Sequence, residues 1–182
     1  MIIIDTETTG LPEPSNAPLA VQPQIIDICA IKLDDNTLEE VDCYSELINP
    51  QKELPEIITK ITGITDAELE GEQPFVFHYA KLCDLFLGER ILIAHNLDFD
   101  GAVLGFELSR IGKLLEFPWP PRRICTVEAT FGIKGHRLKM SDLYAHCHDG
   151  ATFKGAHRAE ADTRALASCI RWLAKEGVVE LP

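Results

Sequence analysis

The sequence predicts an α/β fold in which one mixed β-sheet is flanked by helices, and we expect residues 1–182 to form a single domain. Three apolar, β-branched segments follow one another near the N-terminus through short connections, which favours an antiparallel meander. Helical and strand-like segments then alternate as far as the C-terminus, which is typical of strands added in parallel. A chain of 182 residues with 46% hydrophobic and 25% charged residues is long and apolar enough to bury its own core.

The N-terminal part of the chain supplies the meander. Residues 1–6 have the pattern of a buried strand, because four apolar residues run into polar ones and Gly10 then interrupts the pattern. Residues 11–23 contain four prolines and no helical period, which indicates a loop. Residues 24–33 and 41–48 are β-branched or alternating, so they predict the second and third strands.

Helical spacing appears after the meander. Apolar residues at positions 75, 79, 82 and 86 recur as one helical face between Pro74 and Gly88. No internal repeat and no linker divides the segments that follow. In order, the sequence predicts a helix over 75–86, a strand over 90–95, a helix over 99–110, a strand over 123–125, and helices over 141–146 and 159–176.

The charge is unevenly distributed along the chain. The net charge of −12 argues against a strong, free-standing nucleic-acid binder, because phosphate contacts need Lys and Arg. Residues 34–72 carry twelve acidic residues and only two lysines, which predicts a solvated face or edge. Residues 122–139 carry five basic residues and one acidic residue, so this basic island could hold a polyanion or be a solvated basic loop.

Two absences in the sequence bear on where the protein works. No apolar run reaches the ~18 residues that a membrane span needs, and Asp5 comes too early for a secretory signal peptide. The six cysteines include no Cys-x-x-Cys pair and lie mostly in apolar stretches, so we expect reduced, buried thiols. The sequence therefore predicts a cytoplasmic protein without membrane contact.

Two acidic residues occur together at the end of the first strand. Asp5 and Glu7 are two residues apart, so in a strand both carboxylates project from the same face. Keeping both ionised is costly unless a cation lies between them, and hard divalent ions such as Mg²⁺ and Mn²⁺ take these oxygen ligands. The pair therefore predicts a metal site, and the alternative is two strand-end acids that point into solvent.

A second polar segment, residues 94–100, stands at a predicted strand-to-helix junction. Ligands of open α/β sheets gather at such junctions, which makes its acidic residues candidates for the same site. Asp98 has an alternative role as the helix N-cap, and Asp100 has one as a first-turn acid beside the helix dipole.

A third candidate group lies near the last predicted helix. His157 and Asp162 are five residues apart, so they converge only if His157 precedes the helix, on the turn after Gly155. A loop histidine titrates near neutrality and can serve as a general base, although it can equally be an exposed loop residue.

These groups form three spaced motifs: Asp5-Thr-Glu7-Thr-Thr-Gly10, His95-Asn96-x-x-Phe99-Asp100 and His157-x-x-x-x-Asp162. In order and spacing they resemble the motifs of the DnaQ-like, DEDDh-type 3′–5′ exonucleases. The resemblance spans nearly the whole chain and includes residues 55–66 and 139–143. One departure is Thr62, where the family commonly has His before Gly-Ile, in a loop that is peripheral to the metals.

The resemblance implies a ribonuclease H-like fold and a metal-dependent exonuclease. Two divalent cations, Mg²⁺ or Mn²⁺, would act on the 3′ end of DNA, preferably single-stranded, and nucleoside 5′-monophosphates would be released. Asp5 would bridge both ions, Glu7 and Asp162 would hold the ion beside the nucleophile, and Asp100 would hold the other. His157 would deprotonate the attacking water.

The resemblance also implies a substrate site. Glu7 and the backbone of residues 8–11 would seat the terminal nucleotide, with Leu11 wedged against the last base, and the basic island would carry the upstream strand. The residues expected to contact substrate are Thr6, Thr8, Thr9, Gly10, Leu11, His95, Asn96, Arg122, Arg123 and Arg137.

Other functions remain open at the level of sequence. The same motifs suit an exoribonuclease that trims RNA 3′ ends, since they do not select the sugar. The chain could also act as a proofreading or binding subunit in a DNA polymerase or repair complex, with its acidic face against a basic partner. The short segment after the last helix disfavours docking through a C-terminal tail. His136, His146, Cys147 and His148 match no common zinc spacing, and no zinc site is expected there.

Overall fold

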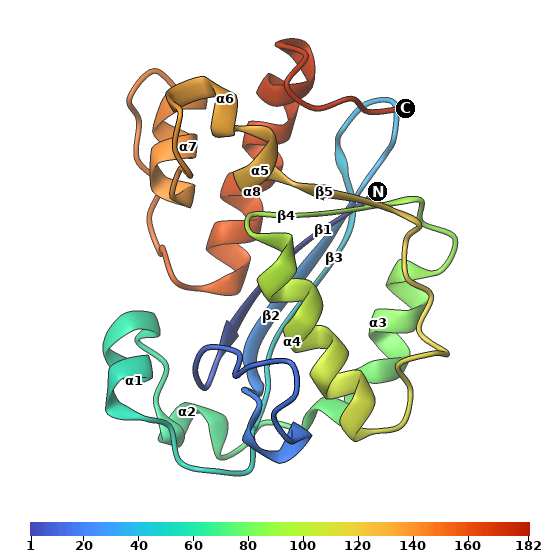
Figure 1. Ribbon diagram of the computed structural model, residues 1–182, viewed down its shortest axis with the longest axis vertical. Helices are drawn as coiled ribbons and strands as arrows, with labels where there is room; N and C mark the ends of the chain where they lie inside the picture. The colour runs from blue at the N-terminus through green and yellow to red at the C-terminus, as the bar shows by residue number, and fades with distance from the viewer.

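A computed structural model describes residues 1–182 and contains one five-stranded sheet in the order β3-β2-β1-β4-β5 (Figure 1). β1 pairs antiparallel with β2, and β2 pairs antiparallel with β3, whereas β4 and β5 are added in parallel on the other side of β1. The predicted mixed sheet and its meander are therefore confirmed. The strands are β1 (Ile2–Thr8), β2 (Ile25–Leu33), β3 (Glu40–Leu47), β4 (Ile91–Ala94) and β5 (Arg122–Cys125).

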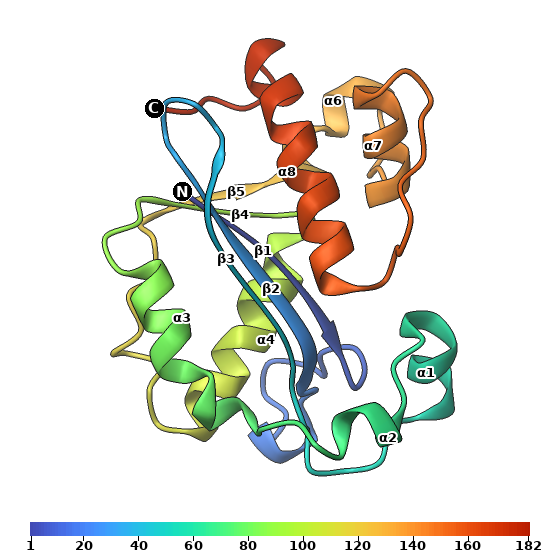
Figure 2. The same ribbon diagram turned by 180° about the vertical axis from the view of Figure 1, so that it is seen from behind.

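Helices cover both faces of the sheet (Figures 1 and 2). On one face α3 (Tyr79–Phe86) and α4 (Leu97–Arg110) pack in one hydrophobic cluster, and on the other α7 (Met140–Cys147) and α8 (Ala159–Lys175) pack in a second. The helices predicted over 99–110, 141–146 and 159–176 correspond to α4, α7 and α8. None of the helices combines the length and the apolar character that crossing a membrane requires.

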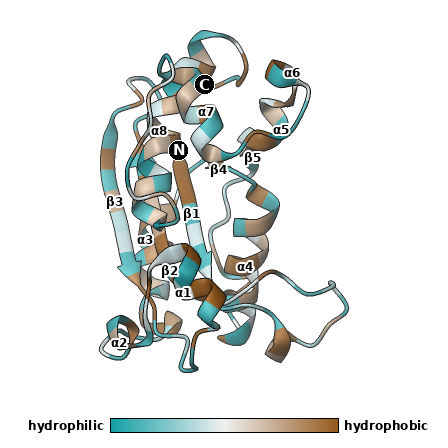
Figure 3. Ribbon diagram, turned by 90° about the vertical axis from the view of Figure 1, so that its left-hand side faces the viewer, coloured by the Kyte–Doolittle hydropathy of each residue, from teal (hydrophilic) through white to brown (hydrophobic).

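Alternating side chains of β1 enter the two clusters. Ile2 and Ile4 pack on the side of α3 and α4, and Ile3 packs on the side of α8. This is the period of two that a strand imposes on its side chains. Figure 3 shows that the apolar colour of β1 fades towards its C-terminal end. The polar end of the same strand must therefore also divide its side chains between the two faces.

Several short helices were absent from the sequence prediction. Helices of three to seven residues are too short to develop a hydrophobic period, which explains why the sequence did not predict them. The sequence nevertheless held one signal, because Thr65 and Glu68 form a capping box at the start of α2. The helices absent from the prediction are η1 (Leu19–Val21), α1 (Glu56–Thr62), α2 (Asp66–Leu69), α5 (Thr126–Ala129) and α6 (Phe131–Lys134). A further short helix, η2 (Phe75–Phe77), lies within the helix predicted over 75–86.

The helix predicted over 75–86 is in two parts, η2 and α3, with His78 between them. The His78 ring is buried and hydrogen-bonded through Nδ1 to the Tyr44 hydroxyl at 2.5 Å and through Nε2 to the Gln73 carbonyl at 3.1 Å. These bonds attach the junction to β3 and to the preceding loop, which accounts for the local departure from one continuous helix.

The proline-rich segment after β1 is a loop apart from η1, and α4 holds its end against β2. Glu107 is 3% exposed, accepts a hydrogen bond from the Ile25 amide at 3.0 Å and pairs with Arg110 at 3.2 Å. Arg110 also donates to the carbonyl oxygens of Gln22 and Pro23. A buried, charge-paired acid thus fixes the beginning of β2 on the α4 side.

Candidate active site

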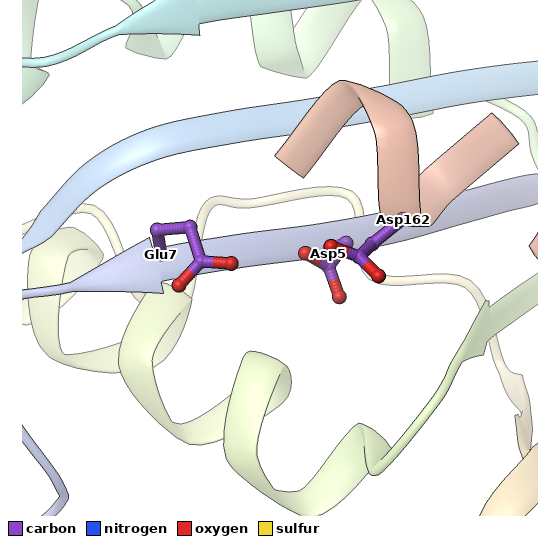
Figure 4. A group of neighbouring side chains, drawn as sticks. All are labelled: Asp5, Glu7 and Asp162. Carbon is purple, nitrogen blue, oxygen red and sulfur yellow. The ribbon is translucent and has the colours of Figure 1, made fainter. Parts of the chain in front are cut away.

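Three carboxylates converge where the polar end of β1 meets the N-terminus of α8 (Figure 4). Asp5 and Glu7 share the face of β1 that α8 covers, and Asp162 lies in the first turn of α8. Carboxylate oxygens of the three residues all lie within 4.8 Å of one another. The predicted convergence of these three residues is therefore present in the structure.

Asp100 reaches the same place from the opposite face of the sheet. It lies in the first turn of α4, is 2% exposed, and accepts a hydrogen bond from the Thr6 hydroxyl at 2.8 Å. Thr6 points to the α4 side because it lies between Asp5 and Glu7 in the strand. Asp98 is exposed and is not the helix N-cap, so that alternative was wrong: α4 begins at Leu97, two residues earlier than predicted, after Asn96 in a left-handed conformation with φ 82°.

The concentration of acids raises the pKa of each of them. Burial raises the pKa of Asp5 well above its usual range, and the charges of Asp100 and Asp162 add to this effect. Burial and the neighbouring Asp162 raise the pKa of Glu7 to about 8. Burial raises the pKa of Asp100 to about 7 and also raises that of Asp162. Without a counter-charge, the protein therefore retains protons on this cluster near neutral pH.

His157 stands on the turn immediately before α8, as its spacing from Asp162 predicts. Its backbone amide donates a hydrogen bond to Oδ2 of Asp162 at 2.7 Å, and its side chain is exposed at the edge of the groove over the acids. The residue has φ 67°, a left-handed conformation that costs a non-glycine residue free energy. The fold thus holds a histidine in a strained turn beside the carboxylates.

The groove over this cluster has a volume of about 560 Å³. The acids and His157 form one part of its lining, and two basic side chains, Arg137 and Lys139, form another. Leu11 reaches the groove with 80% of its surface exposed. The groove therefore combines acidic, basic and apolar walls, which suits a ligand that carries both phosphate and an apolar ring. Further lining residues that the sequence analysis did not single out are Val127, Leu138 and Met140.

The predicted basic island is divided by the fold. Arg137 borders the groove and pairs with Glu128. Arg122 and Arg123 begin β5, at the end of the sheet opposite to the groove, because β5 runs parallel to β4. Arg122 donates to the Glu180 carbonyl, and Arg123 lies over the Trp119 ring at 5.2 Å. The structure brings Arg137 to the acids and leaves the other two arginines at a distance.

The loop that follows β1 reaches the groove at Leu11, and hydrogen bonds of two threonine side chains hold this loop in place. The Thr8 hydroxyl donates to the Gly10 carbonyl at 2.6 Å, and the Thr9 hydroxyl accepts from the Gln24 amide at 3.0 Å. The Thr9 amide in turn donates to the Gln24 carbonyl at 2.9 Å. Both threonine side chains therefore hold the loop, and the exposed Leu11 follows it directly.

His95 and Asn96 also border the groove, at the C-terminal end of β4. The His95 ring is hydrogen-bonded on both nitrogens, to the Thr126 hydroxyl at 2.9 Å and to the Leu138 carbonyl at 3.0 Å. Burial lowers the pKa of His95, so its neutral form is favoured. These contacts attach the segment that carries Arg137 to the sheet, and they engage both nitrogens that a substrate could otherwise use.

The donor set fits a hard divalent cation. Four acidic residues with raised pKa values lie together, and the positive charge of Arg158 lowers the pKa of Glu7 by less than burial and the neighbouring acids raise it. Mg²⁺ and Mn²⁺ prefer carboxylate oxygens and would replace the protons that the cluster otherwise retains.

Comparisons with known proteins place the chain in a family. Residues 2–169 match the family model described as Exonuclease. The chain is 32% identical over 167 residues to the DNA polymerase III subunit epsilon of Treponema pallidum (strain Nichols), covering 88% of this chain and 69% of that protein. It spans only 11% and 7% of the DNA polymerase III PolC-type proteins of Clostridium perfringens and Halalkalibacterium halodurans. It spans 16% of the 3′-5′ exonuclease DinG of Bacillus subtilis.

Solved structures share the fold. Exonuclease X in complex with 5′-overhanging duplex DNA superimposes with a TM-score of 0.65 at 22% identity, covering 96% of this chain and 91% of the other. The nuclease domain of 3′hExo, a DEDDh family member bound to rAMP, superimposes with a TM-score of 0.75 at 19% identity, covering 100% and 94%. The family-model match along most of the chain and the 32% identity to the epsilon subunit show that the chain belongs to the RNase T/DnaQ-like, DEDDh family of 3′–5′ exonucleases.

Proposed function

We propose that residues 1–182 form one exonuclease domain that removes nucleoside 5′-monophosphates from the 3′ end of single-stranded DNA. The observation that supports this most directly is the convergence of Asp5, Glu7 and Asp162 within 4.8 Å, with Asp100 and His157 beside them. Phosphodiester hydrolysis needs charge compensation at the phosphate and a base for the attacking water, and this site offers residues for both.

The four acids would hold two divalent cations, Mg²⁺ or Mn²⁺. When bound, such ions activate water and stabilise charge on the attacking and leaving oxygens of the phosphate. Asp5 is the candidate for contact with both ions, because its carboxylate lies within 4.8 Å of those of Glu7 and Asp162, and the charge of Asp100 also helps to raise its pKa. Glu7 and Asp162 would share one ion, and Asp100 would serve the second.

His157 would take the proton from the attacking water. Its ring is exposed at the groove edge, and its backbone amide is bound to Asp162, so the ring stands beside the acids without being one of them. A neutral imidazole can accept a proton near physiological pH. In this arrangement Asp162 has two roles, since it would bind metal and also orient the turn that carries the base.

The terminal nucleotide would lie in the groove against the loop of residues 8–11. The exposed Leu11 side chain offers an apolar surface for the last base, and backbone groups of the loop are available to the sugar and phosphate. Arg137 and Lys139 would contact the phosphates of the upstream strand. Arg122 and Arg123 lie at the far end of β5, and we leave them out of this path.

DNA is the favoured substrate because a relative of which this chain covers 69% carries the name DNA polymerase III subunit epsilon. That name also supports a polymerase-associated role, in which the acidic segment of residues 34–72 would meet a basic partner. RNA trimming is a second candidate, because 3′hExo was solved with rAMP bound.

The test is digestion of 5′-labelled single-stranded DNA, duplex DNA and RNA of one sequence, with Mg²⁺, Mn²⁺ or EDTA. We expect a ladder that shortens from the 3′ end, fastest on single-stranded DNA, and no product in EDTA. Chain shortening in EDTA, or internal cuts in place of a ladder, would refute the proposed reaction. Faster digestion of RNA would assign the second candidate.

A further inference from the structure

Asp27 is a buried acid that lies close to the active site and has no part in the reaction described above. It is 3% exposed, lies in β2 directly opposite Glu7, and points to the α8 side of the sheet. Its Oδ2 accepts two hydrogen bonds, from Nε of Arg158 at 3.0 Å and from the Ala159 amide at 3.2 Å. A buried carboxylate with a bound guanidinium and a backbone donor is a fixed point in the structure.

These two bonds reach the residues that directly follow His157. The turn before α8 is therefore held at two points: Asp162 binds the His157 amide, and Asp27 binds Arg158 and the Ala159 amide. Because His157 has φ 67°, the turn needs such contacts to remain in this conformation. Arg158 borders a separate groove beside α8 and is not among the residues that line the groove over the acids.

We propose that Asp27 is a positioning residue for His157, in that its carboxylate ties the Arg158–Ala159 segment to β2 and so fixes the place of the imidazole over the groove. This rests on the proposed role of His157 as the base. A misplacement of about 1 Å in a reacting group can cost about 10²-fold in rate, so a second anchor on this turn has a measurable value. Asp27 forms its hydrogen bonds to Arg158 and Ala159 and none to Asp5, Glu7 or Asp162, although its charge adds to the raised pKa values of Asp5 and Glu7.

The kinetic test compares Asp27→Ala and Arg158→Met with the wild-type protein and places Asp27→Ala in a His157→Ala background. We expect Asp27→Ala to lower kcat by about 10- to 100-fold with little change in KM, because the base is displaced while the substrate groove is kept. In the His157→Ala background, Asp27→Ala should lower kcat by no more than about twofold, because the base that Asp27 would position is already absent. A change of about twofold is the usual deviation from additivity for independent sites. Asp27→Asn, whose single carboxamide oxygen can still accept both bonds, should recover part of the rate.

A second readout does not depend on activity. In metal-free protein, hydrogen exchange at the amides of His157 and Ala159 should accelerate in Asp27→Ala, while the amides of β1 keep their protection. Glu107→Ala is the matched control, because Glu107 is also 3% exposed, binds a backbone amide and pairs with an arginine, yet lies on the α4 side. We expect this control to lower stability and to leave both kcat and the exchange at His157 unchanged.

The outcomes separate this inference from the function on which it rests. If Asp27→Ala lowered kcat equally in both backgrounds, or left exchange at His157 unchanged, Asp27 would not act through the turn and the inference would fail. If His157→Ala itself kept the wild-type rate, the proposed base would fail instead, whatever the exchange rates. If Glu107→Ala lowered kcat as much as Asp27→Ala does, general destabilisation would explain the effect and the inference would fail.

Discussion

At the scale of single residues, the alternation of side chains along β1 decides which acidic groups meet. Asp5 and Glu7 face α8 and join Asp162, while Thr6 between them faces α4 and binds Asp100. Three consecutive positions of one strand thereby collect carboxylates from both faces of the sheet. The spacing of the first two acids was sufficient to predict their shared face, because the period of a strand is fixed.

Asp5→Ala is expected to lower hydrolysis by at least ~10²-fold while the fold is retained. The variant removes one proposed metal ligand and also relieves like-charge repulsion, so the metal-free protein should melt no lower than the wild type. Single-turnover digestion and thermal unfolding in EDTA check the two statements separately. Wild-type turnover in this variant would show that the metal site lies elsewhere.

His157→Ala is expected to lower the single-turnover rate by ~10²–10⁴-fold, the usual effect of losing a general base. Binding of Mn²⁺ and of an oligonucleotide should survive, because the imidazole is proposed to contact only water. Hydroxide can replace the base, so the residual rate should keep rising with pH where the wild-type rate levels off. Superimposable pH–rate profiles for the two proteins would exclude this histidine as the base.

The sequence was less informative about residues whose role depends on distant contacts. It placed His95 among the substrate residues, but the structure shows both of its ring nitrogens bonded to Thr126 and Leu138. It treated Arg122 and Arg137 as one island, although they stand at different ends of the sheet. Neighbours in sequence can diverge in space wherever short helices turn the chain, and here α5 and α6 lie between the two arginines.

At the scale of elements, the strands and the longer helices were predictable, and the short helices were not. Strands such as β1 and β2 and helices such as α4 and α8 carry enough residues for a hydrophobic period to emerge. The helices of residues 56–69 are local and were hidden within an acidic stretch, although the capping box at Thr65 and Glu68 marked one of them. The mixture of an antiparallel meander with parallel strands followed from the succession of strands and helices, because crossovers through helices produce parallel neighbours. The order in which the strands lie, with β4 beside β1, was not predicted.

The segment between α6 and α7 supplies the basic wall of the groove, and this can be tested against β5. Arg137→Ala should raise KM and flatten the dependence of log KM on log salt by about one phosphate contact. Arg123→Ala is the matched control, since it removes the same charge at the other end of the sheet and should leave the slope unchanged. A larger change in slope for Arg123→Ala than for Arg137→Ala would mean that the strand follows another path.

At the scale of the whole molecule, the net charge of −12 and the raised pKa values of the active-site acids act together. In a strongly acidic chain with four carboxylates in one groove, repulsion among the acids destabilises the folded state unless protons or cations compensate their charge. The stability of the whole fold should therefore depend on pH and on divalent ions. The sequence indicated the excess of acids, but only the fold shows how many of them are buried together.

Metal-free protein should lose stability as the pH rises from 6.5 to 8. The folded-state pKa values of Glu7 and Asp100, about 8 and 7, exceed their unfolded values, so the folded state binds more protons and becomes less stable as these are released. His95 has the opposite sign, because burial lowers its pKa, but above pH 6.5 it is largely neutral in both states.

Thermal unfolding in EDTA and in saturating Mg²⁺ measures this effect. The melting temperature should fall with pH in EDTA, and Mg²⁺ should raise it and remove most of the slope, since cations replace the protons. Glu7→Gln should flatten the slope in EDTA. A melting temperature that rises over this range in EDTA would contradict the protonated state of the cluster.

Because His157 has a left-handed backbone conformation, heat resistance and catalysis favour different residues at this position. At φ 67° a glycine would avoid a backbone penalty of about 1–2 kcal/mol that the histidine incurs. A library screened only for resistance to heating should therefore enrich glycine at this position and discard the proposed base. A library screened for digestion of DNA should retain the histidine and find its stabilising changes in other parts of the chain, so that the two screens would diverge first at this one turn.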